Sequence, residues 1–109
     1  MRRNSVAVVG AAETTELGEI PNTSQLELHC DAALNALADA GLERETIGYI
    51  NAHATATPAG DKIEIDALKE AFGDHARRLA VSATKSMHGH LVGAAGALEF
   101  AITLMALNK

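Results

Sequence analysis

The stretch that decides the fold is LAVSATKSMHGHLVGAAGALEFAITLMAL, residues 79–107. It begins with a short apolar run at 79–83, continues through a polar segment at 84–90, and ends in a long apolar run at 91–107. This order predicts a strand, a loop and a helix, and in open α/β sheets such a loop lies at the carboxyl end of the strand, where ligands bind. Because residues 91–107 are apolar on nearly every side, we expect this helix to be buried on more than one face.

The same alternation of strand and helix runs through the rest of the chain. Short apolar runs predict further strands at 6–9 and 47–51, and apolar residues at helical spacing predict helices between Ser24 and Gly41 and between Asp61 and Gly73. The resulting order is βαβαβα. Strands that alternate with helices predict an α/β fold with a parallel sheet and right-handed crossovers.

Local signals mark the ends of the first two expected helices. Ser24 and Glu27 fit a capping box at the start of the first helix, and Gly41 is a typical C-terminal stop. Asp61 and Glu64 have the same spacing and predict a second capping box.

The sequence also predicts which side chains on and near these helices are buried and which are exposed. Cys30 falls on the apolar stripe of the first helix, which predicts a buried core residue. His29 lies on another face of that helix and is expected to be solvated. His75, with Arg77 and Arg78, is expected at the surface between the second helix and the next strand.

Size and composition narrow the class of protein. The chain has 109 residues, 48% of them hydrophobic and 21% charged, which indicates one small globular domain. A net charge of −5 argues against nucleic acid or an anionic membrane as a partner. A single cysteine excludes an internal disulfide and agrees with a cytoplasmic location. The apolar run at 91–107 is short for a membrane span and carries Glu99 at its centre.

Two polar loops carry the candidate chemistry. His53 follows the strand at 47–51, and Lys85 and His90 follow the strand at 79–83. Because parallel strands end at the same edge of a sheet, we expect these three side chains to converge. Two imidazoles and an ammonium can stabilise a developing oxyanion or enolate, or move a proton. Further neutral donors in the two loops are Asn51, Thr55, Thr57 and Ser86.

Two other interpretations of this region involve cations. Glu99 is expected either to pair with Lys85 or to coordinate a structural monovalent cation, because a buried carboxylate needs a partner. His88 and His90 could bind zinc together with Cys30 or His53, although their spacing matches no common ligand motif. A metal-dependent hydrolase that uses His53, His88 and His90 is therefore one alternative function.

The two loop motifs, YINAHATATPAGD at 49–61 and SATKSMHGHLVGAAG at 82–96, resemble the C-terminal half of β-ketoacyl-[acyl-carrier-protein] synthases. The similarity runs from about residue 33 to residue 109. The resemblance implies that His53 and His90 act in decarboxylation of the malonyl extender, with Lys85 in the same site. It also implies that Thr55 and Thr57 bind the phosphopantetheine arm. Glu99 then corresponds to a buried glutamate that supports the lysine and a structural cation.

The first forty residues look different. Residues 6–14 (VAVVGAAET) and 33–42 (ALNALADAGL) are similar to the N-terminus of sterol-carrier-type thiolases, a family that shares the fold of the synthases. That fold consists of two similar halves. The resemblance therefore implies a single thiolase-like half-domain over residues 1–109, with a thiolase-like start at 1–42 and synthase-like motifs at 43–109.

The resemblance also implies what this half lacks. In the synthases the condensing cysteine is carried by the other half, and Cys30 does not match its position. The leading hypothesis is thus a β-ketoacyl-synthase-type acyltransferase of fatty acid synthesis, present as the half that bears the histidines and the lysine. The alternative is a non-catalytic half that binds a thioester or pantetheine. Acyl-carrier protein or a coenzyme A thioester is the implied partner, no further cofactor is expected, and a homodimer would cover the apolar helix.

Overall fold

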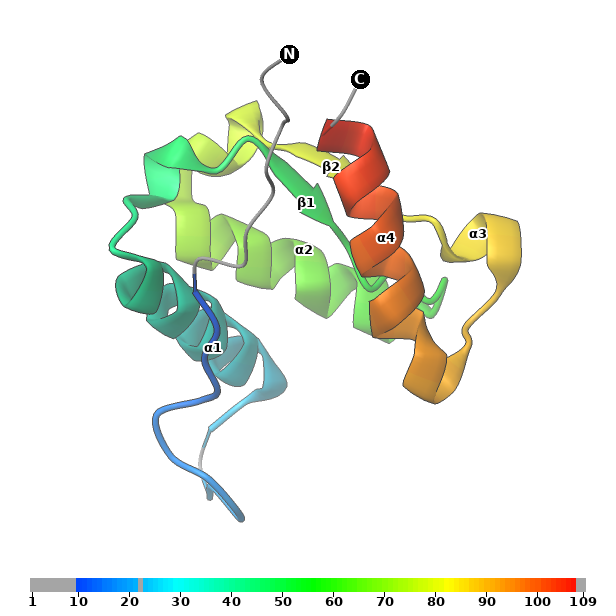
Figure 1. The fold of residues 1–109 in the computed structure, drawn as a ribbon. Coiled ribbons are helices and arrows are strands. Elements are labelled where there is room, and N and C mark those ends of the chain that lie inside the picture. Colours follow the sequence, from blue (N-terminus) through cyan, green and yellow to red (C-terminus); the bar gives the residue numbers. More distant parts are fainter. Residues whose placement is uncertain (1–9, 22, 108–109) are drawn as a thin grey trace.

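The computed structural model describes residues 10–21 and 23–107, which form helices around a small sheet (Figure 1). The expected strand at 6–9 lies outside the described residues. Three short 3-10 turns connect the main elements: η1 (Arg44–Thr46), η2 (Gly73–Arg78) and η3 (Val92–Ala94). The main elements are α1 (Gln25–Ala40), β1 (Tyr49–Asn51), α2 (Pro58–Phe72), β2 (Ala80–Ser82), α3 (Lys85–His88) and α4 (Ala95–Leu107).

The sheet of the described residues consists of β1 and β2, which pair in parallel. Tyr49 lies opposite Ala80, and Asn51 lies opposite Ser82. Helix α2 provides the connection between the two strands, as parallel pairing requires. The α/β class and the parallel sheet are therefore confirmed, whereas the complete βαβαβα order depends on residues outside the described part of the chain.

Helices cover the two faces of this sheet in different ways. Ile50 packs against the core between α1 and α2, whereas the neighbouring Asn51 binds α4 through its side chain. Because successive strand residues point to opposite faces, α4 lies on the face opposite α1 and α2. Figure 1 shows the same arrangement, with α4 on one side of β1 and the α1–α2 pair on the other.

Helix α1 begins and ends where its sequence signals predict. The Ser24 side chain accepts a hydrogen bond from the Glu27 N–H, and the Glu27 carboxylate accepts one from the Ser24 N–H, so the capping box is confirmed. Gly41 ends the helix with a φ of 64°. Gly10 approaches α1 so closely that a Cβ there would lie 2.5 Å from the carbonyl oxygen of Ala36. The backbone of residue 10 therefore needs glycine to pack on this helix.

The core lies between α1 and α2 and is built from small side chains and one aromatic ring. Its buried members are Cys30, Ala67, Ala71 and Phe72. The prediction that Cys30 is a buried core residue is thus confirmed, and its thiol donates to the Ala67 carbonyl oxygen at 3.3 Å.

Two predictions near α2 are wrong. The helix begins at Pro58 with Thr57 as its N-cap, so Asp61 and Glu64 lie inside the helix and do not form a capping box. Proline is favoured in the first turn because that N–H needs no partner within the helix. His75 is buried rather than exposed, because its Nε2 binds the Ile47 carbonyl oxygen at 2.7 Å and its ring packs beside Phe72.

The prediction of one strongly buried helix at 91–107 is also wrong for this chain by itself. Residues 92–94 form η3, and in α4 itself only Ala95 is buried. Phe100 and Met105 are 52% and 66% exposed, because the sheet covers one stripe of the helix and no other described element packs on the outer side. None of the helices in the described part of the chain combines the length and apolarity needed to cross a membrane.

Candidate active site

The two histidine loops meet at the carboxyl edge of the sheet. His53 is the second residue after β1, and His90 follows α3 in the segment that leaves β2. Their rings lie edge to face, with centroids 5.2 Å apart and an interplanar angle of 87°. The structure therefore brings together the two imidazoles that the sequence placed in one cavity.

Backbone contacts indicate which nitrogen of His90 carries the proton. The Val92 N–H lies 3.3 Å from Nδ1 of His90, so Nδ1 accepts this hydrogen bond. In the neutral ring the proton then belongs on Nε2. An N–H of this kind can donate to an oxyanion or enolate oxygen.

Lys85 is the most enclosed charged group of the site. Its side chain is 4% exposed and its ammonium forms an ion pair with Glu99 of α4, whose side chain is 16% exposed. The hydrogen bond from Lys85, aided by the positive charge of the Lys85 ammonium, lowers the pKa of the Glu99 carboxyl. Glu99 is therefore held as a carboxylate, and pairing with Lys85 is the outcome that the structure supports.

Asn51 ties the end of β1 to α4 beside this ion pair. Its Nδ2 donates to the Glu99 carbonyl oxygen at 3.1 Å and to Thr103 Oγ1 at 3.2 Å, and Thr103 in turn donates to the Glu99 carbonyl oxygen. Sequence reasoning missed Thr103, because a threonine inside an apolar helix gives no signal of its partner. Oδ1 of Asn51 is buried with no partner among the described residues. A monovalent cation near Glu99 stays a prediction.

Thr55 and Thr57 lie in the loop that carries His53. Their hydroxyl oxygens are 3.3 Å apart. Gly60 makes room for one of them, since a Cβ at this position would lie 2.4 Å from Thr57 Oγ1. The two threonines are thus neighbours of each other on the same loop, and Ser86, which lies in α3, is exposed.

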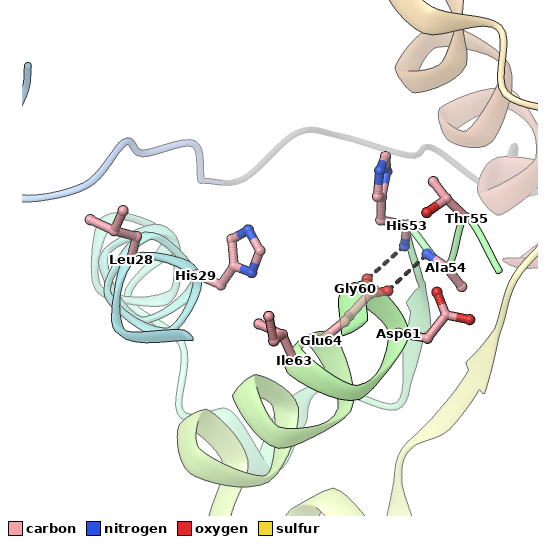
Figure 2. Close-up of a pocket in the computed structure, with 9 residues that line it drawn as sticks. All are labelled: Leu28, His29, His53, Ala54, Thr55, Gly60, Asp61, Ile63 and Glu64. Atoms are coloured by element: carbon pink, nitrogen blue, oxygen red, sulfur yellow. Dashed lines mark hydrogen bonds between the residues drawn. The ribbon is translucent and has the colours of Figure 1, made fainter. Parts of the chain in front are cut away.

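Glu64 is a functional candidate that sequence reasoning assigned to the wrong role. Its carboxylate accepts hydrogen bonds from the backbone N–H groups of His53, at 2.6 Å, and Ala54, at 2.8 Å (Figure 2). The same loop contains two non-glycine residues with positive φ, Ala54 at 28° and Ala56 at 62°. Pro58 was the signal that the helix begins too early for a capping box at Asp61.

The zinc interpretation has no support in the geometry of the described residues. His88 Nδ1 lies 2.7 Å from the Gly89 carbonyl oxygen and therefore donates to it, and Nε2 lies 3.2 Å from Thr84 Oγ1. Within residues 10–21 and 23–107, no group of three or more His, Cys, Asp or Glu side chains is placed to hold a metal ion. The hydrolase alternative built on His53, His88 and His90 is therefore not supported.

A cavity of about 370 Å³ opens beside His53, between α1 and the start of α2. Figure 2 shows that His29 projects from α1 toward this space and that Ile63 contributes an apolar wall. Thr55 and Asp61 also line it. The cavity thus joins the histidine loop to a mixed polar and apolar surface.

Cys30 does not belong to this site. Its thiol is buried between α1 and α2, and burial, followed by the negative charge of Glu70, raises the pKa of the thiol. A buried thiol of raised pKa is a poor nucleophile. Cys30 is therefore a structural residue of the core.

Comparisons with known proteins identify the family. A family profile described as "Beta-ketoacyl synthase, C-terminal domain" matches residues 6–109, so it also includes most of the N-terminal stretch that resembles thiolases. In the C-terminal part, 74 residues are 59% identical to 3-oxoacyl-[acyl-carrier-protein] synthase 2 of Coxiella burnetii, covering 68% of this chain and 18% of that protein. Nodulation protein E of Rhizobium sp. strain N33 is 50% identical over 80 residues, covering 72% of this chain and 20% of that protein.

A solved structure gives the same answer for the fold. It is described as a type II PKS acyl-carrier protein in complex with its ketosynthase bound to the hexaketide. It matches with a TM-score of 0.77 and 27% identity, covering 90% of this chain and 24% of that chain. The chain thus spans about a fifth of the length of these relatives. It belongs to the β-ketoacyl synthase family, as a C-terminal domain of the ketosynthase type.

Proposed function

We propose that this chain is the half of a β-ketoacyl-synthase-type acyltransferase that bears the histidines and the lysine, for condensation of acyl and malonyl thioesters in fatty acid synthesis. The observation that carries the proposal is the edge-to-face contact of His53 and His90 at 5.2 Å, in the loops that follow two paired parallel strands. The Lys85–Glu99 pair lies in the same region and fixes a positive charge there.

The reaction step assigned to this half is decarboxylation of a malonyl thioester. The bond between the α-carbon and the carboxylate carbon breaks, carbon dioxide leaves, and the electron pair moves onto the thioester as an enolate. Imidazole N–H groups from His53 and His90 stabilise the enolate oxygen. When no acyl group is present for attack, the α-carbon takes a proton and the product is an acetyl thioester.

Full condensation needs a nucleophile that this chain does not place in the site. The enolate carbon attacks an acyl group held as a thioester on an enzyme cysteine, whose thiolate leaves as the new carbon–carbon bond forms. Cys30 is buried in the α1–α2 core. The proposal therefore assigns the cysteine to a different half of the complete enzyme.

Acyl-carrier protein is the proposed carrier of the substrate. The similar solved structure contains an acyl-carrier protein bound to a ketosynthase, and the similar synthases carry that partner in their names. Thr55 and Thr57, with hydroxyl groups 3.3 Å apart beside His53, are proposed to hydrogen-bond the pantetheine arm. A coenzyme A thioester presents the same arm and is the simpler substrate for a first assay.

The test is release of carbon dioxide from carboxyl-labelled malonyl-coenzyme A and malonyl acyl-carrier protein. We expect the wild-type chain to exceed the uncatalysed rate, and the double variant His53→Ala/His90→Ala to fall to that rate. The matched control is Arg77→Ala/Arg78→Ala, which removes two exposed basic side chains of η2, an element outside both loops. Equal rates for the wild type and the histidine variant would refute the proposed activity.

A non-catalytic binding half is the second candidate. The cavity of about 370 Å³ beside His53 and Thr55, together with the buried Cys30, favours it. Calorimetric titration with coenzyme A separates the two candidates. Binding of coenzyme A without release of carbon dioxide from its malonyl thioester supports this second function.

We also propose that two copies of the chain pair through the outer face of α4. Phe100, Met105 and Leu107 are all more than half exposed on this helix. Apolar patches of this kind on soluble proteins mark association surfaces. Multi-angle light scattering at micromolar concentration is expected to show a dimer for the wild type and a monomer for Met105→Glu; a monomeric wild type would contradict this pairing.

A further inference from the structure

Glu64 connects the most firmly packed helix of the molecule to the loop that carries His53. We infer that Glu64 is a positioning residue, whose carboxylate fixes the backbone of the His53 loop so that the imidazole faces His90. The claim that Glu64 orients the loop rests on the geometry alone. Its consequence for decarboxylation rests on the proposed function.

Pairing with β2 holds the chain only as far as Ala52. The last ladder hydrogen bond beyond β1 runs from the Ala52 N–H to the Ser82 carbonyl oxygen, at 2.8 Å. The next two N–H groups, those of His53 and Ala54, bind the two oxygens of Glu64 instead. One carboxylate therefore takes over exactly where strand pairing ends, and it holds two consecutive residues with one side chain.

The His53 loop needs an external anchor. Ala54 has a φ of 28° and Ala56 a φ of 62°, a region that residues with a Cβ rarely occupy. Such a backbone persists only when its surroundings hold it in place. The two short hydrogen bonds to Glu64 act at the residue where the first positive φ occurs.

The Glu64 anchor is itself fixed. Glu64 lies one helical turn before Ala67 and Leu68, and both of these side chains take part in the α1–α2 core. Residues three and four apart share one face of a helix. The packing of the core therefore sets where the carboxylate stands, and the carboxylate sets where His53 stands (Figure 2).

The experiment compares isotope-labelled wild type with Glu64→Gln, Glu64→Ala and the matched control Glu70→Gln. The control removes the same charge from an exposed position of the same helix. The first readout is the nuclear Overhauser effect between the ring protons of His53 and His90. The second is amide hydrogen exchange at His53 and Ala54, with Ala67 and Ala71 as reference amides in the core.

We expect the ring-to-ring signal in the wild type and in Glu70→Gln, a weaker signal in Glu64→Gln, and none in Glu64→Ala. The two loop amides should exchange about tenfold faster in Glu64→Ala, because hydrogen bonds to a carboxylate are lost. The core amides should keep their protection. An unchanged ring signal in both Glu64 variants overturns the inference, and so does loss of core protection, which would make Glu64 a general stability residue.

Activity is measured separately, so that the two claims can fail independently. In Glu64→Gln we expect kcat for malonyl-thioester decarboxylation to fall with little change in KM, because the substrate arm is still bound while His53 is misplaced. If the wild type shows the ring signal but no decarboxylation, the proposed function fails and the positioning inference stands. If the ring signal survives in Glu64→Ala, the inference fails whatever the activity.

Discussion

The α1–α2 layer and the α4 side of the sheet are built in opposite ways. Between α1 and α2, small apolar side chains and Phe72 form a buried core, and the ends of α1 are capped by its own sequence. On the α4 side, the contacts described here are polar: an ion pair from Lys85 to Glu99 and hydrogen bonds from Asn51. Three large apolar side chains of α4 are exposed: Phe100, Met105 and Leu107.

The two sides of the sheet therefore have different roles: the α1–α2 core stabilises the fold, and the α4 side holds the charged groups of the candidate site. The first layer is held by burial of apolar side chains from two helices, which does not depend on the match of single atoms, so it supports the loops without entering the site. The second depends on single polar atoms that meet with defined geometry, and it leaves Phe100 and Met105 of α4 exposed. The comparison predicts that apolar truncations matter most in the first layer and charge changes matter most in the second.

The largest expected effect is a loss of stability in Phe72→Ala, and Phe100→Ala is the comparison. Phe72→Ala should lower the free energy of unfolding by about 3–5 kcal/mol, because a buried ring leaves a cavity. Phe100→Ala should cost less than about 1 kcal/mol in the monomer, because that ring is already 52% exposed. Urea titrations at a concentration below the dimer range measure both. Equal losses of unfolding free energy in the two variants would contradict the proposed difference between the two layers.

The next effect is electrostatic and depends on pH. The pKa of Glu99 is lowered in the folded chain, so its pairing with Lys85 contributes stability above the ordinary value of 4.5, and this stability is lost as pH falls through the lowered pKa. Glu99→Gln should therefore destabilise the protein at pH 6, and its difference from the wild type should shrink toward pH 3.

A surface pair on α2 provides the control for this titration. Asp66 has a pKa that Lys62 lowers by a hydrogen bond, but the Lys62 side chain is 76% exposed. Asp66→Asn should change stability at pH 6 far less than Glu99→Gln, because exposed pairs contribute little. The contrast is contradicted if the two variants lose the same stability.

The smallest effect tests the local design of the first layer. Ser24→Ala should cost about 1 kcal/mol, because it removes the side chain that accepts from the Glu27 N–H. Thermal or urea unfolding measures this loss, and circular dichroism should show the first turn of α1 frayed. No change in stability would mean that α1 is held by its packing on α2 alone.

The sequence predicted the positions of the site residues better than it predicted which polar side chains are exposed. It placed His53, His90 and Lys85 at one sheet edge and expected Glu99 either to pair with Lys85 or to bind a cation. The structure brings His53 to His90 and Lys85 to Glu99. It misplaced His75, whose partner is a carbonyl oxygen 28 residues away. It also assigned Glu64 to a cap, since the spacing of a capping box says nothing about which N–H groups a carboxylate will meet in space.

The α/β class with its parallel strands, the boundaries of α1, the buried position of Cys30 and the family were set by the sequence alone, because periodicity, caps and motifs act over a few neighbouring residues. The tertiary structure alone decided that Glu64 binds the His53 loop, that Thr103 and Asn51 meet, and that Phe100 and Met105 of α4 are exposed. These features join different elements of the fold, so they are decided by the packing of helices and strands rather than by any local pattern.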